Sequence, residues 1–440
     1  MSSELTETLY LSINPQNAFF SVGTTSNWSV YSINPFQKKF TRSVSSGGVS
    51  IVEMLSSSNI FGLVGNDQTE RLSKSNLYIW DDFKKENIIE LKFRETIYGL
   101  RLSHHEIFVV LNNDLHIYDF STLKLIDQIS TFDNEQGIID FCELPNSHDL
   151  LALVTLGPRK GTISIKRFEH RIQSQETSTK KLPKKESGSE QGTLKTKEIK
   201  QKIQNEKETN VQNLNNSNKN NPEESTNQDN SNTTDNKTNT TSNQNDNTNI
   251  STSTKSNYNQ TAFVIQIDDS GIGNVVISPC GRFVAACGIK GTIIKIYSCI
   301  TGELITEKKR GTKRAIICDM AFHPECKYLI ATSRHGTIHV FSLAEVENFL
   351  KKEKSLLENN KEKENSSFVF FGSKQKRADF KGKISKDQNS KCSFLSDQQI
   401  IAITESGEFY KFVIDLKNNE LRMIEKKIFL QNTKIQKQEN

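Results

Sequence analysis

The sequence predicts an all-β fold, a seven-bladed β-propeller of the WD-repeat type with a long disordered insertion in one blade. Two observations carry this prediction. Segments in which β-branched and aromatic residues alternate recur along the 440 residues, and this alternation is typical of strands with one buried face. Where nothing interrupts them, the copies are spaced by roughly 40 to 50 residues, the period of propeller blades of four strands each.

The repeated strand occurs seven times, and several copies follow a Gly or Asn turn. The copies are residues 28–31, 77–80, 115–118, 162–165, 292–297, 337–341 and 409–412. Each of the first six comes after a more apolar run, such as Ile60 to Val64. A β-sandwich would not need so many equivalent repeats, so we expect a propeller. Helical periodicity is hard to find outside residues 344–364.

Residues 171–260 interrupt the repeat. They are almost wholly Asn, Gln, Ser, Thr, Lys and Glu, with no aromatic residue before Tyr258. Such a stretch buries too little apolar surface to offset the entropy of ordering, so we expect it to be disordered. Residues 1–170 then hold blades 1 to 4, and residues 261–430 hold the last strand of blade 4 and blades 5 to 7. The insertion either carries regulatory or partner sites or has no role.

A second interruption is a long loop at residues 344–377. Its charged first part, residues 344–363, has apolar positions partly at helical spacing. An aromatic run follows with Phe368, Phe370 and Phe371, and cations come directly after it. Rings at headgroup depth with cations against anionic lipid make an interfacial membrane anchor. The alternative is a strand that packs Phe368 and Phe370 on one side.

Composition narrows the functional class. The net charge of +5 is mild, and no dense basic face for nucleic acid is visible. The seven cysteines show neither C-x-x-C pairs nor metal-ligand spacing with His, so we expect buried free thiols in a reducing compartment. The first residues lack the pattern of a signal peptide, and no apolar run approaches about 18 residues. We therefore expect a cytoplasmic protein.

No catalytic constellation stands out, and we expect neither an enzyme nor a cofactor nor a metal. Motifs such as G-x-S-x-G, the P-loop and H-E-x-x-H are absent from the sequence. The pair His104-His105 falls at an expected hairpin tip beside Glu106, and solvated turn residues are the favoured interpretation over a metal site. Asp81 and Asp82 end a strand at a regular blade position.

A basic run, Lys308-Lys309-Arg310-Gly311, lies between two copies of the repeated strand. Cations held on a rigid rim suit a phosphate group, and a glycine beside them lets the backbone come close. The alternative is a solvated charge cluster, because most basic runs are of that kind.

Several motifs occur in a specific order. They are the turn Gly47-Gly48, VEML at residues 52–55, IWDD at residues 79–82, and the Gly-Thr strands that begin at Lys290 and His335. In this combination the chain resembles the PROPPINs, β-propellers that bind polyphosphoinositides in autophagy and include the WIPI proteins. The resemblance covers nearly the whole chain outside the insertion. It is stronger to the branch that includes WIPI3- and WIPI4-like proteins.

The resemblance assigns a role to the basic run. The family's hallmark is Phe/Leu-Arg-Arg-Gly between the fifth and sixth blades, and each Arg serves one of two phosphoinositide pockets. Here Lys308 replaces the apolar residue and Lys309 replaces the first Arg, while Arg310 and Gly311 match. Lysine keeps the charge but loses the planar fork that grips a phosphate with two bonds.

The same resemblance implies one intact and one eroded pocket. In the second pocket these positions match the family: Thr332, Ser333, Gly336, Thr337 and His339. In the first pocket Asp268 stands where the family favours His, Ala286 and Gly288 stand for Thr and Ser, and Lys295 stands for Arg. An acid repels a phosphate, and Ala and Gly supply no hydroxyl donor.

The implied function is recognition of phosphatidylinositol 3-phosphate or 3,5-bisphosphate on pre-autophagosomal, endosomal or vacuolar membranes, as an effector and scaffold in autophagosome formation. The resemblance also implies a protein partner, the rod-like lipid-transfer protein of autophagy, docked on the early blades near Asn14 and Gln16. We expect a monomer that binds no nucleic acid. The alternative is a protein-only scaffold in endomembrane trafficking whose lipid sites have decayed.

Overall fold

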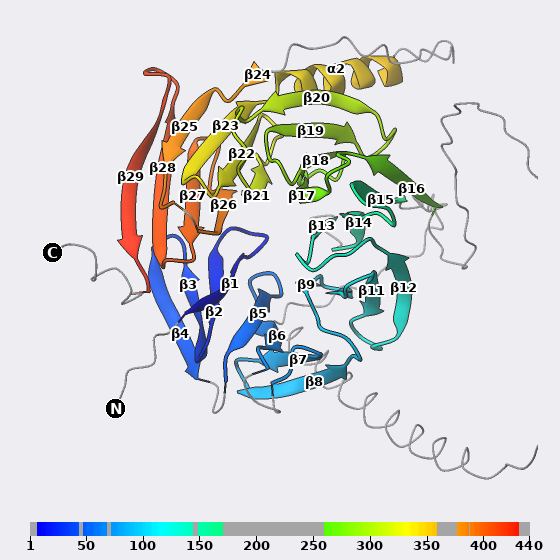
Figure 1. Ribbon diagram of the computed structural model, residues 1–440, viewed down its shortest axis with the longest axis vertical. Helices are drawn as coiled ribbons and strands as arrows, with labels where there is room; N and C mark the ends of the chain where they lie inside the picture. The colour runs from blue at the N-terminus through cyan, green and yellow to red at the C-terminus, as the bar shows by residue number, and fades with distance from the viewer. Residues whose placement is uncertain are drawn as a thin grey trace, which may run out of the picture. The chain divides into compact units, whose positions relative to one another are not determined.

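Seven sheets, each built on four antiparallel strands, surround a central axis in the computed structural model (Figure 1). The structure describes residues 7–43, 47–67, 72–143, 148–169, 259–358, 376–386 and 388–430. Contacts divide the chain into two units. The first, residues 1–120, 124–171 and 255–440, contains the sheets; of the second, residues 121–123 and 172–254, only the turn 121–123 is described. The predicted seven-bladed propeller is confirmed.

The first four blades take their strands in chain order. Blade 1 consists of β1 (Thr8–Ile13), β2 (Phe19–Thr24), β3 (Asn27–Ser32) and β4 (Gln37–Ser43). Blade 2 consists of β5 (Val49–Met54), β6 (Ile60–Gly65), β7 (Asn76–Asp81) and β8 (Glu86–Lys92). Blade 3 consists of β9 (Gly99–Leu102), β10 (Glu106–Val110), β11 (Asp114–Asp119) and β12 (Leu125–Ser130). Blade 4 consists of β13 (Ile139–Glu143), β14 (Leu150–Leu156), β15 (Thr162–Glu169) and β16 (Asn259–Gln266).

The last three blades include one added strand. Blade 5 consists of β17 (Ile272–Ile277), β18 (Phe283–Gly288), β19 (Ile293–Ser298) and β20 (Leu304–Lys309), with β24 (Lys376–Arg377) beside β20. Blade 6 consists of β21 (Ile317–Phe322), β22 (Tyr328–Ser333), β23 (Thr337–Ser342) and β25 (Phe380–Lys383). Blade 7 consists of β26 (Ser390–Phe394), β27 (Gln399–Thr404), β28 (Glu408–Asp415) and β29 (Glu420–Ile428).

The repeated segment of the sequence is the third strand of every blade. Its seven copies lie in β3, β7, β11, β15, β19, β23 and β28. The apolar run that precedes it is the second strand, which packs between neighbouring blades; all six residues of β18, for example, are buried. The fourth strand lies at the outer edge and is largely exposed, as in β4 and β29. Burial of both faces explains why the second strands lack alternation.

Blades 1 and 7 meet through side chains, because each takes its four strands from one continuous stretch. Ser393 Oγ donates to Asn17 Oδ1 (2.6 Å), and Asn17 Nδ2 donates to the Phe394 carbonyl (3.0 Å). Phe20 and Tyr31 stack with ring centroids 4.8 Å apart within the apolar cluster that joins the two blades. These contacts close the ring.

The long insertion leaves and returns within one hairpin. Strands β15 and β16 are antiparallel, and their pairing extends from Thr162 with Gln266 to Glu169 with Asn259. The insertion therefore connects two paired residues of blade 4, where a long loop adds only a slowly growing entropy cost. Residues 170–258 themselves lie outside the described part of the chain.

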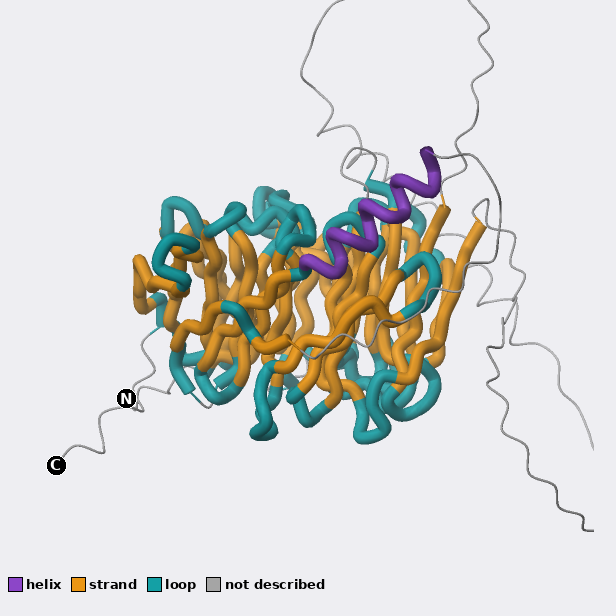
Figure 2. Tube along the Cα trace, turned by 90° about the horizontal axis from the view of Figure 1, so that it is seen from above, coloured by secondary structure: helices purple, strands orange, loops and turns teal. Residues whose placement is uncertain are grey.

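The second interruption begins with helix α2 (Ala344–Glu358), as the charged periodicity indicates. Val346 is fully buried, and Phe349 and Leu350 pack against the core shared by blades 5 and 6, so α2 lies outside β20 (Figure 1, Figure 2). The chain returns as β24, which pairs in parallel with the end of β20. Among the described residues, no helix has both the length and the apolar character needed to cross a bilayer.

Candidate anion site at the rim of blades 5 and 6

The basic run does not form a continuous cationic surface. Lys308 and Lys309 are the last residues of β20, and Arg310 and Gly311 begin the connection to β21. Because side chains alternate along a strand, Lys308 and Arg310 point to the interior while Lys309 is partly exposed. The four positions therefore have different surroundings.

Lys308 is a structural cation. Its side chain is 1% exposed, and its Nζ lies 2.7 Å from Glu345 Oε2 in the first turn of α2. Lys376 Nζ lies 3.2 Å from the other carboxylate oxygen. Burial, the largest single effect, would raise the pKa of the Glu345 carboxyl, but its hydrogen bonds with Lys308, the backbone and Lys376, together with the charge of Lys308, lower the pKa. The lysine that replaces an apolar residue is thus neutralised by a carboxylate.

Arg310 is buried and is held by backbone carbonyls. The residue is 7% exposed; Nε donates to the Gly291 carbonyl (2.5 Å), and Nη2 donates to the Lys313 carbonyl. Burial lowers the pKa of its guanidinium. In the part of the chain that the structure describes, no carboxylate pairs with this cation. A guanidinium has five N–H donors, so donors remain for an anion.

Ser333, Thr337 and His339 form a hydrogen-bonded row beside it. Ser333 and Thr337 face each other across the β22–β23 turn, with 2.8 Å between their hydroxyl oxygens. The Thr337 hydroxyl lies 2.9 Å from His339 Nε2. The antiparallel register of β22 and β23 therefore places three hydrogen-bonding side chains in one row.

His339 is neutral at physiological pH. The residue is 5% exposed, and its burial, followed by the charges of Arg310 and Lys381, lowers the pKa of the imidazole to about 4. Its Nδ1 is buried without a hydrogen-bond partner. The interaction with Arg310 shows that the connection between blades 5 and 6 brings the guanidinium close to the row. The structure thus brings together the residues expected in the second pocket.

The expected first pocket contains its own anion. The Asp268 carboxylate accepts hydrogen bonds from the Ser270 amide (2.8 Å) and hydroxyl (2.5 Å). Burial would raise the pKa of Asp268, but these bonds and the charges of Lys290 and Lys295 lower it. Lys295 Nζ donates to the Ile267 carbonyl (2.8 Å). The lysine at the position of the family's Arg therefore already has an acceptor and an anionic neighbour.

Gly288 explains how the carboxylate fits. A Cβ atom at Gly288 would lie 2.5 Å from Asp268 Oδ2, closer than real Cβ atoms come to other atoms. The aspartate thus fills the space that a serine at position 288 would need. Ala286, which pairs with Lys295 in the sheet, supplies no donor.

Lys309 and Gly311 remain open to a ligand. Lys309 is partly exposed next to Ile293 and Arg377, and it makes no ion pair with a described residue. A Cβ atom at Gly311 would meet no heavy atom within 4 Å. The backbone at Gly311 is therefore accessible from outside, so its role does not depend on tight packing within the chain.

Two further groups of predicted site residues have different outcomes. The aromatic residues expected to insert into a membrane, Phe368, Phe370 and Phe371, lie outside the described residues. Asn14, expected as a polar partner contact, is 4% exposed and organises a turn, because its Oδ1 accepts from the amides of Ala18 (2.9 Å) and Phe19 (2.8 Å). That expectation for Asn14 is wrong. Gln16 is exposed.

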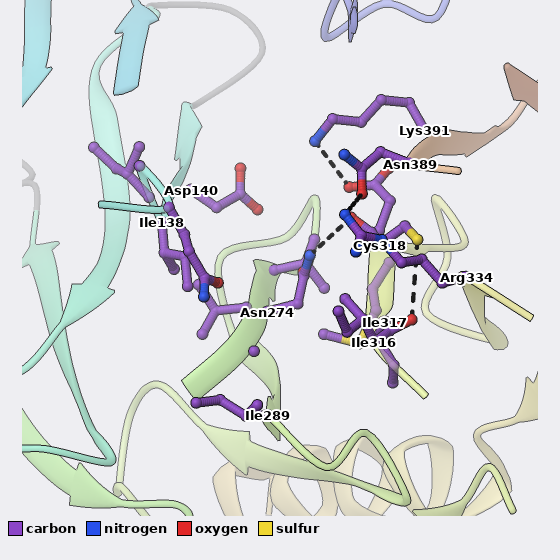
Figure 3. Close-up of a pocket in the computed structure, with 18 of the residues that line it drawn as sticks. Ile138, Asp140, Asn274, Ile289, Ile316, Ile317, Cys318, Arg334, Asn389 and Lys391 are labelled. Carbon is purple, nitrogen blue, oxygen red and sulfur yellow. Dashed lines mark hydrogen bonds and ion pairs between the residues drawn. The ribbon is translucent and has the colours of Figure 1, made fainter. Parts of the chain in front are cut away.

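A cavity of about 500 Å³ opens along the central axis, lined by the first strands of blades 3 to 7 (Figure 3). Its charged groups have partners among other side chains or the backbone. Lys391 lies 3.2 Å from Asp319, and Asp140 accepts from the Ile277 amide at 2.7 Å. Arg101 pairs with Glu53 at 2.5 Å. The cavity contains none of the predicted rim residues, and its inward charges stabilise the junctions between blades.

Sequence reasoning missed two residues that shape the rim. Glu345 neutralises Lys308 from 37 residues away, and Lys381 contributes to the lowered pKa of His339. An acid in the first turn of a helix ordinarily indicates interaction with the helix dipole. The sequence position of Glu345 therefore did not indicate its ion pair with Lys308.

Comparisons with known proteins agree with this architecture. The PROPPIN family model matches residues 241–364. Autophagy-related protein 18e of Arabidopsis thaliana is 23% identical over 326 residues, which cover 74% of this chain and 63% of that protein. Autophagy-related protein 18 of Meyerozyma guilliermondii is 26% identical over 361 residues, 78% of this chain and 58% of that protein. The chain thus spans about three fifths of the length of these two relatives.

Solved structures support the same fold. Kluyveromyces lactis Hsv2 with a complete loop 6CD superposes with a TM-score of 0.61 at 17% identity, covering 97% of this chain and 100% of that chain. Kluyveromyces marxianus Hsv2 gives a TM-score of 0.60, also at 17% identity, covering 97% and 99%. At this identity the likeness bears on the fold alone. The chain is thus similar to PROPPIN family proteins in sequence and to the Hsv2 structures in fold.

Proposed function

We propose that the chain is a phosphoinositide-binding propeller that acts as a peripheral membrane effector and scaffold in autophagosome formation. The observation that carries the proposal is Arg310, a buried guanidinium that no described carboxylate neutralises. A buried cation without a counter-charge is costly, and a bound phosphate would offset that cost. The proposed role in autophagy rests on the match to the PROPPIN family model and on the names of the curated relatives.

The headgroup phosphate binds between the blade 5–6 connection and the β22–β23 turn. Arg310 donates its remaining N–H groups to phosphate oxygens, and these charge-assisted bonds are the strongest in the site. The hydroxyls of Ser333 and Thr337 turn toward the phosphate, and neutral His339 holds Thr337 in place. Gly311 lets the lipid approach the backbone.

Only this second pocket binds phosphate strongly. In the first pocket the Asp268 carboxylate lies where an anion would have to enter, and its charge repels phosphate. Lys309 and Lys295 contribute long-range attraction, which salt screens. A propeller with one working pocket lacks the avidity that two pockets give on a membrane. We therefore propose weaker membrane binding than in a family member with both pockets.

The loop after α2 supplies a second membrane contact. The Glu345 pairs hold the start of α2 on blade 5, and β24 returns the chain to the same strand. The segment from α2 to β24, which includes Phe368, Phe370 and Phe371, therefore begins and ends beside blade 5. Exposed Lys376 and Arg377 add positive charge there. We propose that the three rings enter the bilayer while these cations contact anionic lipid.

The protein partner proposed for this chain rests on its resemblance to the family alone. A solved structure with a similar fold is described as a complex of KlAtg21 with the coiled coil of AgAtg16. For this chain we propose the rod-like lipid-transfer protein of autophagy, docked on the early blades near exposed Gln16. We also propose the WIPI3- and WIPI4-like branch, a monomeric state and a cytoplasmic location with recruitment to membranes.

Flotation of the full chain with liposomes across the phosphoinositide series tests the proposal. We expect flotation with phosphatidylinositol 3-phosphate or 3,5-bisphosphate and none with phosphatidylinositol. A protein-only scaffold is the second candidate, favoured by the self-occupied first pocket. Absence of flotation with every phosphoinositide at low salt would leave that candidate standing.

A further inference from the structure

Two histidines and a glutamate meet where blade 3 faces blade 4. His104 lies in the turn between β9 and β10, Glu143 ends β13, and His148 precedes β14. One potential ligand atom from each residue lies within 4.8 Å of the others. This arrangement differs from the expectation of a solvated hairpin tip, because the side chain of His104 is only 29% exposed. The other two members of the cluster, Glu143 and His148, lie 39 and 44 positions further along the chain.

Glu143 orients the cluster. Its Oε1 accepts a hydrogen bond from the backbone amide of His104 (3.0 Å), which leaves Oε2 only 3.5 Å from His104 Nδ1. That nitrogen is buried and has no hydrogen-bond partner. A buried polar atom without a partner is costly, so the site favours an additional group that can bind the nitrogen.

The third side chain stacks on the first. The rings of His104 and His148 lie with centroids 3.7 Å apart and planes at 22°. Stacking by itself does not align ring nitrogens, but here the ligand atoms of both rings converge with the carboxylate. The turn that carries His104 is fixed, because Ser103 Oγ accepts from the Glu106 amide (2.6 Å). The first two ligands are therefore positioned by backbone contacts.

We propose that His104, Glu143 and His148 bind a divalent transition metal ion, with Zn²⁺ as the reference ion. Two imidazoles and one carboxylate are a ligand set that Zn²⁺ and neighbouring ions accept, with water at the open position. Metal–ligand bonds of about 2.0 to 2.2 Å place tetrahedral ligand atoms about 3.3 to 3.6 Å apart. The pair His104–Glu143 already has this spacing, and the ligand atom of His148 lies within 4.8 Å of both.

The site is separate from the proposed phosphate pocket. Antiparallel strands reverse direction, so turns between first and second strands lie on the face opposite to turns between second and third strands. His104 lies on a turn of the first kind, whereas Ser333 and Thr337 lie on a turn of the second kind. Figure 2 shows the turns gathered on the two faces. A bound ion would join blades 3 and 4 without touching the lipid site.

Titration of the full chain with Co²⁺ and Zn²⁺ tests the proposal. We expect one ion per chain, and a Co²⁺ spectrum without the thiolate charge-transfer band that cysteine ligands such as Cys280 would produce. His104→Ala and His148→Ala should each weaken binding by at least about tenfold, since each removes a ligand. Glu143→Gln keeps an acceptor for the His104 amide but loses the charge, and should also weaken binding. His105→Ala, the adjacent histidine outside the cluster, is the matched control.

X-ray absorption at the zinc edge of the wild-type protein keeps the test independent of how the variants fold. Two imidazoles and oxygen ligands are expected, together with a melting temperature that rises on adding Zn²⁺ to wild type and His105→Ala only. Failure of the wild type to bind either ion, sulfur in the coordination shell, or binding that survives both His104→Ala and His148→Ala would overturn the proposal.

Discussion

Lys308 Nζ lies 2.7 Å from Glu345 Oε2, and this ion pair joins the outer strand of blade 5 to the first turn of α2. The lysine stands where the PROPPIN hallmark has an apolar residue. Its burial and its partner explain how a charge replaces that residue without entering the phosphate site. The pair also fixes the start of the loop that returns as β24.

Lys308→Ala should lower the free energy of unfolding by about 3 kcal/mol, because it leaves a partly buried carboxylate short of a partner. Urea unfolding measures this loss. The double variant Lys308→Leu with Glu345→Ala should lose clearly less, since it removes both charges. Lys351→Ala is the control: its pair with Glu347 is exposed, and its loss should be small beside that of Lys308→Ala. Equal losses in the single and double variants would contradict the account.

His339 should make stability depend on pH. Its folded pKa is about 4, against 6.5 in the unfolded chain, so between these values the unfolded chain binds a proton that the folded chain does not. Its contribution is complete above pH 6.5 and is lost as the pH falls to 4, by about 3 kcal/mol in total. Unfolding of wild type and His339→Asn at pH 7.5 and 4.5 isolates the difference. Identical pH dependence in the two proteins would refute this assignment.

The first pocket should recover only when its aspartate is removed. Gly288→Ser alone should destabilise the fold, because its Cβ would lie 2.5 Å from Asp268 Oδ2. Asp268→His together with Gly288→Ser removes that contact, and adding Lys309→Arg and Lys295→Arg restores both forks. Flotation with phosphatidylinositol 3-phosphate should then exceed that of wild type. If Gly288→Ser alone is as stable as wild type, the carboxylate does not fill the pocket.

The aromatic loop should act only on a bilayer. Replacing Phe368, Phe370 and Phe371 by Ser should weaken liposome binding and leave binding of a soluble headgroup unchanged, since rings that insert contribute only where lipid is present. Paired flotation and headgroup titrations give the comparison. A fall in headgroup affinity, or a misfolded triple variant, would instead place the rings in the protein core.

Local pattern predicted the fold well, for a physical reason. Alternation of β-branched and aromatic residues depends on which face of a strand is buried, and all seven predicted copies are third strands of blades. The start of α2 at Ala344 also follows from spacing along the chain. Strand alternation and helical spacing depend on residues close together in the chain, so they can be recognised from the sequence alone.

The sites depended on distant pairs, and these were harder to predict. The resemblance placed Arg310 and His339 in one pocket, but the burial of Lys308 was not visible because Glu345 is 37 residues away. The contact of Asp268 with Gly288 and the meeting of His104 with His148 arise only when neighbouring strands and blades assemble. No local pattern encodes which side chains meet in this way.

The most direct test of the phosphate site compares Arg310→Ala with Arg314→Ala in liposome flotation. Arg314 lies on the same connection and is exposed. Its replacement by Ala removes the same charge as Arg310→Ala, but from the surface. With phosphatidylinositol 3-phosphate liposomes, Arg310→Ala should lose more than about tenfold in affinity, the weight of one or two charge-assisted hydrogen bonds. Arg314→Ala should stay within about twofold, because an exposed charge contributes little. Equal binding by the two variants would show that Arg310 holds no phosphate and would contradict the account.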